Sequence, residues 1–140
     1  MSLTKAECDA FLKELRIGTL CTLNADGSPN AIPIWYHWTG EKIHMFTSRG
    51  TAKTKRLARD PRACLSVAEP VGGPESWVTV EGTVELLEEG GKELALSRAK
   101  HYYDPNLYKD TARSGKTIAH WEQSDDFVLL ELTPTRIRSE

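Results

Sequence analysis

The hydrophobic pattern at the start of the chain is that of an amphipathic helix. Thr4 and Glu7 have the spacing of a capping box, in which each side chain bonds a backbone amide of the other residue. Apolar residues then recur three or four positions apart, at Cys8, Phe11, Leu12 and Leu15. The pattern therefore predicts a helix that starts after Thr4 and ends near residues 16–18.

Alternating apolar positions separated by turn residues next predict six β-strands. Asp26-Gly27 is a hairpin signal between the first two. The second strand contains Pro33, which has no amide proton for a ladder, so it marks an edge, a bulge or a place where something other than a strand approaches. The predicted strands cover residues 17–23, 30–38, 42–48, 62–68, 76–87 and 127–132.

Two further helices are predicted, over residues 51–59 and 90–103, each ending before an Asp-Pro pair. Residues 106–121 are ambiguous, with one more short helix as one interpretation. Six short strands with turns between most of them favour a mainly β fold, a closed antiparallel barrel with flanking helices. The length of 140 residues predicts a single domain over residues 1–140.

Composition narrows the class of protein. Apolar residues make up 39% and charged residues 27%, which is typical of a globular chain. A net charge of −2 provides no general attraction to nucleic acid or to anionic membranes. The polar N-terminus is unlike a secretion signal, and no apolar run is long enough for a membrane span, so we expect a cytoplasmic protein. The dispersed cysteines, Cys8, Cys21 and Cys64, are interpreted as small buried hydrophobic residues.

The strongest local feature is a basic segment at a predicted strand-to-helix corner. Six basic residues and one acidic residue lie between positions 49 and 62, in a chain that is acidic overall. Free amides at a helix start bind anions, and Thr47, Ser48, Arg49 and Lys53 add hydroxyl and cationic donors. The segment at residues 47–53 is therefore a candidate phosphate site; a solvated helix face is the alternative.

Aromatic residues form the second cluster, and other chemistry is weakly supported. Trp35, Tyr36 and Trp38 crowd one strand and Trp77 begins another, which is compatible with a flat apolar pocket or with ordinary core packing. The four histidines lack the spacing of metal ligands, so no metal site is expected. No nucleophile-and-base pair can be assigned, so catalytic side chains stay unknown.

The order of several short motifs resembles that of a known family. They run from Gly18-Thr-Leu-Cys-Thr-Leu through Phe46-Thr-Ser-Arg-Gly to Asp60-Pro-Arg62-Ala and Val80-Glu-Gly-Thr. Residues 51–62 are the best single match. Together these motifs look like the pyridoxamine 5'-phosphate oxidase-like flavin-binding split barrels over residues 5–103.

The resemblance implies a six-stranded antiparallel split β-barrel that forms a homodimer, with FMN in each of two clefts between the subunits. Lys53 matches the family's phosphate-binding lysine, and residues 32–37 match the strand whose backbone lies along the isoalloxazine ring. Trp77 matches a position that contacts the flavin from the strand after the loop. The expected cofactor-binding residues are Ile32, Pro33, Ile34, Trp35, Phe46, Thr47, Ser48, Arg49, Lys53 and Trp77.

The resemblance also bears on activity. In the oxidase proper the ring-facing strand begins with arginine and ends with lysine, whereas this chain has Ile32 and His37. That favours the short relatives, which use FMN or the deazaflavin F420. The predicted function is a flavin-dependent oxidoreductase that transfers hydride to or from a small molecule, with Tyr36 or His37 as candidates for proton transfer. An F420-dependent reductase and a non-enzymatic flavin- or haem-binding protein are the alternatives.

Overall fold

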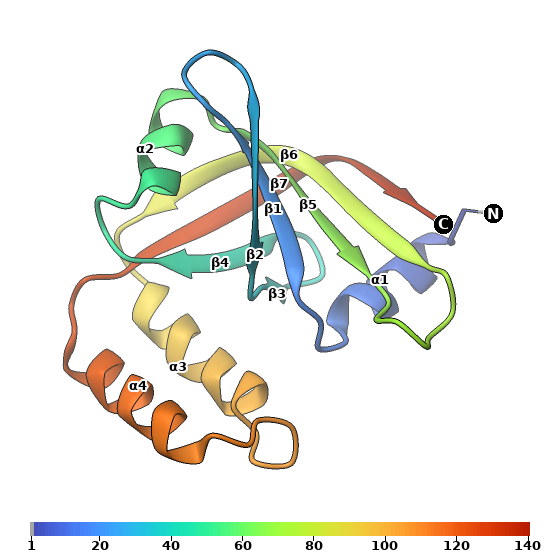
Figure 1. Ribbon diagram of the computed structural model, residues 1–140. Helices are drawn as coiled ribbons and strands as arrows, with labels where there is room; N and C mark the ends of the chain where they lie inside the picture. Colours follow the sequence, from blue (N-terminus) through green and yellow to red (C-terminus); the bar gives the residue numbers. More distant parts are fainter. Residues whose placement is uncertain (1) are drawn as a thin grey trace.

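The computed structural model describes residues 2–140, which fold as a curled antiparallel sheet with four helices around it (Figure 1). The helices are α1 (Lys5–Lys13), α2 (Ala52–Arg59), α3 (Gly91–Tyr102) and α4 (Thr111–Gln123). The strands are β1 (Gly18–Leu23), β2 (Pro29–Ile34), β3 (His37–Trp38), β4 (Ile43–Thr47), β5 (Arg62–Ala68), β6 (Trp77–Leu87) and β7 (Val128–Ser139).

The order of the strands explains why the sheet curls. It runs β2-β1-β5-β6-β7-β4-β3, so β2 and β3 are its two edges. Yet only Trp35 and Tyr36 separate these two strands along the chain. Since a residue spans at most about 3.6 Å, the two edges must lie close together. The sheet is therefore bent into a half-barrel, and we call the place where its edges meet, at Trp35 and Tyr36, the seam.

The structure corrects the predicted strands in two places. The strand expected over residues 30–38 is broken at the seam, which gives seven strands in place of six. The last strand continues from residue 132 to Ser139, because residues 133–139 pair with the first half of β6. Pro33 lies on the edge strand β2, as its missing amide proton required. The ambiguous segment 106–121 contains most of α4.

The core fills the concave side of the sheet. Along each strand alternate residues point inward, as the period of two demands. Phe11 and Leu12 of α1 and Leu57 of α2 add to this cluster from the helices. The largest fully buried side chains are Leu12, Leu20, Ile43, Met45, Leu57, Leu65, Val67, Val78, Val80, Leu130 and Leu132.

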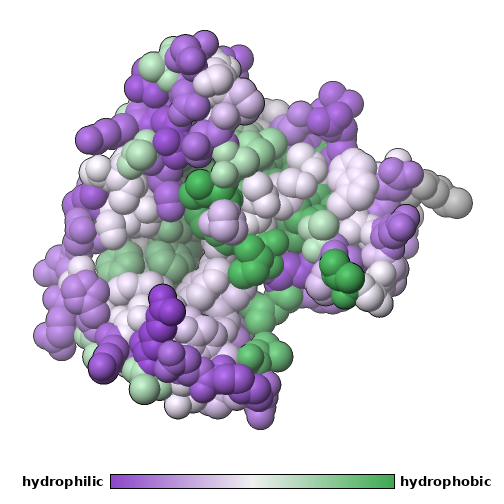
Figure 2. All heavy atoms as spheres, in the orientation of Figure 1, coloured by the Kyte–Doolittle hydropathy of each residue, from purple (hydrophilic) through white to green (hydrophobic). Residues whose placement is uncertain are grey.

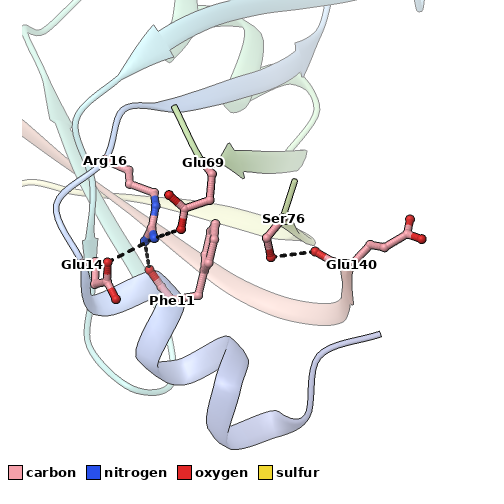
Figure 3. A network of polar contacts seen from close by, with 6 residues as sticks. All are labelled: Phe11, Glu14, Arg16, Glu69, Ser76 and Glu140. Atoms are coloured by element: carbon pink, nitrogen blue, oxygen red, sulfur yellow. Dashed lines mark hydrogen bonds and ion pairs between the residues drawn. The ribbon is translucent and has the colours of Figure 1, made fainter. Parts of the chain in front are cut away.

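The predicted capping box at the start of α1 is confirmed. The Thr4 side chain accepts from the Glu7 amide at 3.1 Å, and the Glu7 carboxylate accepts from the Thr4 amide at 3.0 Å. Beyond the other end of the helix, the Arg16 guanidinium lies 3.7 Å from the centre of the Phe11 ring and pairs with Glu69 in the loop after β5 (Figure 3). Through Arg16, these contacts join the C-terminal end of α1 to the loop that follows β5.

The three cysteines are free thiols with different surroundings. Cys8 is buried, as predicted, but Cys21 and Cys64 are only half-buried. Within residues 2–140, no helix is long and apolar enough to cross a bilayer.

Candidate functional site

A cavity of about 340 Å³ lies at the seam. Pro33, Ile34 and Trp35 line it from the β2 side, and Phe46 lines it from β4. The remaining lining residues are Ile17, Tyr103 and Trp121. We call this the aromatic cavity. Its volume is at the lower end of the range typical of small-molecule pockets.

The rings around this cavity hold one another in place. Trp35 stacks on Tyr102 with centroids 4.5 Å apart and planes 5° apart. Trp121 meets Phe46 edge-to-face at 5.4 Å. Such pairs are favourable beyond their area of contact because the ring edge is positive and the face negative. The result is a rigid, flat-sided apolar wall.

Helices α3 and α4 supply the side of the cavity opposite the strands. They pack against each other as a hairpin beyond β4 and β7, away from α2 (Figure 1). Figure 2 shows apolar side chains gathered on this face over β1 and β2, with hydrophilic surface on α2 to one side and on α4 to the other. An apolar part of a ligand could therefore bind on this face, between the hydrophilic surfaces of α2 and α4.

The phosphate candidate, residues 47–53, continues directly from this wall. Phe46 lines the cavity, and the next residue, Thr47, ends β4 and is buried. Its hydroxyl lies 3.3 Å from that of Thr51, the N-cap residue of α2. The Thr51 side chain makes no capping bond, so the first-turn amides of α2 keep their donors available. Gly50 turns the chain here with a φ of +68°, a conformation that favours glycine.

Lys53 is the most telling residue of this segment. It is half-buried in the first turn of α2, yet among the described residues it has no ion pair and no hydrogen-bonded side chain. Burial, followed by the positive charge of Arg56, lowers the pKa of Lys53 below its ordinary value. A cation that is partly desolvated and uncompensated gains stability from an anion. The residues present therefore fit a phosphate group.

The other predicted phosphate ligands are placed less directly. Ser48 is exposed beside the corner. The Arg49 guanidinium pairs with Glu88, and both side chains are largely exposed. Arg49 thus belongs to the segment, but its guanidinium is held by a carboxylate, which a bound phosphate would have to displace.

Trp77 is not part of the same cluster. It begins β6 and is about one-third exposed. It lines a separate, larger cavity between α1 and the last residues of β7, of about 1520 Å³. Within one chain the structure therefore brings together Pro33, Ile34, Trp35, Phe46 and residues 47–53, and leaves Trp77 elsewhere. Ile32 is half-buried and packs against the core on the inner side of β2.

The two candidates for proton transfer differ in access. Tyr36 is buried, its hydroxyl has no hydrogen-bond partner among residues 2–140, and burial raises its pKa far above the ordinary value. It is a core residue in this arrangement. His37 is half-buried in β3; burial, and then the charge of Arg98, lowers its pKa. Neutral His37 could accept a proton near pH 7, although neither residue lines the aromatic cavity.

Sequence reasoning missed Trp121 as a site residue. It lies in the ambiguous segment 106–121, where nothing local in the sequence places a residue of α4 against β4. A signal was available in the aromatic residues: Tyr103 and Tyr108 lie in the connection between α3 and α4, and Trp121 lies in α4.

The sequence profile of the pyridoxamine 5'-phosphate oxidase family matches residues 4–140. The chain belongs to this family. Solved structures agree with the fold. A conserved hypothetical protein from Mycobacterium tuberculosis is 26% identical with a TM-score of 0.71, over 98% of this chain and 84% of the other.

Two further solved structures with a similar fold carry descriptions of what they do. A protein described as an F420 reductase is 21% identical with a TM-score of 0.64, over 92% of this chain and 94% of its own; at that identity the likeness concerns the fold alone. A heme binding protein from Mycobacterium smegmatis is 27% identical with a TM-score of 0.64, over 99% of this chain and 54% of its own. The same fold thus occurs in proteins that are described as binding different molecules.

Proposed function

We propose that this protein is a flavin-dependent oxidoreductase of the pyridoxamine 5'-phosphate oxidase family that binds FMN between residues 47–53 and the aromatic cavity. The observation that carries the proposal is Lys53, a half-buried cation with no ion pair among residues 2–140. It lies beside helix amides that no side chain caps, and the strand that leads to it, β4, carries Phe46 of the aromatic cavity. A ligand that joins a phosphate to an apolar ring system matches this arrangement, with the phosphate at Lys53 and the ring at the aromatic wall. The family membership supports the same assignment.

The chain's own residues would bind and orient, and the cofactor when bound would supply the hydride chemistry. Lys53 and the first amides of α2 hold the phosphate. Strand β2 is an edge, so half of its backbone groups point away from β1 and are available to the polar rim of a ring. Trp35, Phe46 and Trp121 exclude water from the cavity. His37 is the candidate for moving a proton because it is half-buried, whereas Tyr36 is buried and its hydroxyl has no partner among residues 2–140.

The decisive experiment compares two lysines of one helix. Lys53→Ala removes the unpaired cation, whereas Lys55→Ala removes an exposed cation two positions away. A charged hydrogen bond contributes about 1.5–3 kcal/mol, so Lys53→Ala should weaken FMN binding roughly tenfold or more. Lys55→Ala should leave the dissociation constant within about twofold. Equal affinities of both variants and the parent protein would refute the phosphate assignment.

The bound molecule distinguishes the FMN enzyme from the two alternatives, an F420-dependent reductase and a haem-binding protein. F420 also bears a phosphate, so it would share the dependence on Lys53 and differ in absorption spectrum and mass. A haem would give a Soret band and require no phosphate. Release of the ligand from freshly purified protein, followed by its spectrum and mass, distinguishes the three. Turnover of an electron donor by the loaded protein then separates an enzyme from a carrier.

We further propose that the site is completed by a second copy of the chain, because Trp77 lies away from the aromatic cavity of its own chain. Subunit mixing tests this. If Trp77 acts across the interface, a mixed dimer of Lys53→Ala and Trp77→Ala chains contains one site with both native residues. Equal mixing of the two defective variants makes about half of the dimers mixed, so about one quarter of all sites should regain high affinity for FMN. No recovery, or a monomer by light scattering at micromolar concentration, would refute a shared site.

A further inference from the structure

Cys21 and Cys64 lie directly opposite each other on neighbouring strands. They are paired positions in the antiparallel ladder between β1 and β5, although 43 positions apart in sequence. Their neighbours Leu20 and Leu65, which are also paired, point into the core, so both cysteines point to the outer face. Paired positions in antiparallel strands have Cα atoms about 4.5 or 5.5 Å apart, and both values suit a disulfide.

The surroundings show two thiols in contact and within reach of solvent. Both are half-buried and free. They line an open cavity of about 480 Å³ on the outer face of the sheet. Burial, and then the neighbouring Cys21 thiol, raises the pKa of Cys64 to about 11. Cys64 therefore stays protonated at neutral pH, which leaves Cys21 as the nucleophile of the pair.

Charged groups border the pair on one side. Glu81 on β6 is the ladder partner of Cys64, and it also raises the pKa of that thiol. The Glu81 carboxylate accepts a hydrogen bond from Arg138 at 3.1 Å, and the Arg136 guanidinium lies 3.8 Å away. The positive charge of Arg138 opposes the effect of Glu81 on Cys64. The two cysteines thus have charged neighbours of both signs, which can stabilise a change in the charge of a thiol.

We propose that Cys21 and Cys64 form a reversible intramolecular disulfide when the protein meets a hydroperoxide. No cysteine participates in the proposed cofactor site, so this modification site is separate from it.

The reaction balances as two displacements. The Cys21 thiolate attacks the distal oxygen of the hydroperoxide; the O–O bond breaks, and the leaving alkoxide takes a proton from water to become an alcohol. Cys21 is now a sulfenic acid. The Cys64 sulfur attacks that sulfur, the S–O bond breaks, and the hydroxide leaves with the Cys64 proton as water. Two thiols are oxidised by two electrons, and one hydroperoxide is reduced.

The test uses the full chain, reduced and then exposed to hydrogen peroxide. After quenching, free thiols are alkylated in denaturant and counted by intact mass, and the linked peptides are mapped. We expect the three free thiols to fall to one, with Cys8 alone alkylated and a peptide joining positions 21 and 64. Dithiothreitol should restore all three.

Two variants show whether the lost thiols are those of Cys21 and Cys64. Cys8→Ala should still lose two thiols, because Cys8 is buried in the core beside α1. Cys64→Ala should form no disulfide and should accumulate a sulfenic acid at Cys21, trapped by dimedone. Three thiols remaining in the parent protein would overturn the proposal, as would a bridge to Cys8 or a bridge between chains on a non-reducing gel. Circular dichroism of each variant confirms that it is folded.

Discussion

Gly82 is the position where the smallest change should most damage the sheet. It lies at a register shift between Glu81 and Gly82, within the long pairing of β6 and β7. A Cβ atom there would be 2.0 Å from the Thr133 carbonyl oxygen and 3.1 Å from the Pro134 Cα. Both are backbone atoms, so no side-chain rotation relieves the clash. Gly82→Ala therefore forces the strands themselves apart.

The size of the effect follows from that geometry. Real Cβ atoms essentially never come closer than 3.0 Å to such an atom, so the strands must separate locally by about 1 Å. This breaks two or three ladder hydrogen bonds at about 1 kcal/mol each, and overpacking adds about 1–3 kcal/mol. We expect Gly82→Ala to lower the free energy of unfolding by about 3–6 kcal/mol.

Urea denaturation followed by circular dichroism measures this change. Gly115→Ala is the matched control, because Gly115 is exposed inside α4 and a Cβ there meets no atom within 4 Å. Alanine is the better helix former, so that variant should gain about 0.5–1 kcal/mol. A loss below about 1 kcal/mol for Gly82→Ala would show that the bulge adapts, and the reasoning would be wrong.

Three further predictions follow from other contacts. Tyr36→Phe removes a buried hydroxyl that has no partner within residues 2–140, so urea denaturation should show unchanged or slightly raised stability. Hydrogen bonds from Lys42, and then from a histidine, lower the pKa of Glu131. The stabilisation by ionised Glu131 is present above the unfolded pKa and is lost as pH falls through the lower folded pKa. Glu131→Gln should therefore be less stable than the parent at pH 7, and the difference should shrink as the pH is lowered through the acidic range. Glu88→Gln frees Arg49 from its ion pair, so FMN titration should show tighter binding, by about twofold to fivefold.

Local signals gave most of the fold. The capping box, the turns and the alternation of apolar residues are patterns of a few neighbouring residues. Helices α1, α2 and α3 and strands β1, β4, β5 and β6 could therefore be predicted. The break at Trp35 and Tyr36 could not, because the alternation continues through it and only closure of the sheet demands a bend. The extension of β7 to Ser139 depends on pairing with β6, which is a distant contact.

The site divides in the same way. The segment around Lys53 could be found because charge, a corner glycine and a helix start are adjacent in sequence. The role of Trp121 depends on how α4 packs against β4, and the opposition of Cys21 and Cys64 depends on strand register. Neither can be read from spacing along the chain. Family resemblance supplied the expectation for Trp77, whose place in a shared site stays a prediction.

The seam has a consequence for how long the protein survives in a cell. Within residues 2–140 no ladder joins β2 to β3 or β4, so these edges are held by two linking residues and by side-chain packing. A molecule bound in the aromatic cavity would contact Pro33 on β2 and Phe46 on β4, and so would hold the two edges of the sheet together. Chains without ligand should open first at this edge and be degraded sooner, because binding stabilises the closed form by mass action. The supply of the ligand would then set the abundance of the protein as well as its activity.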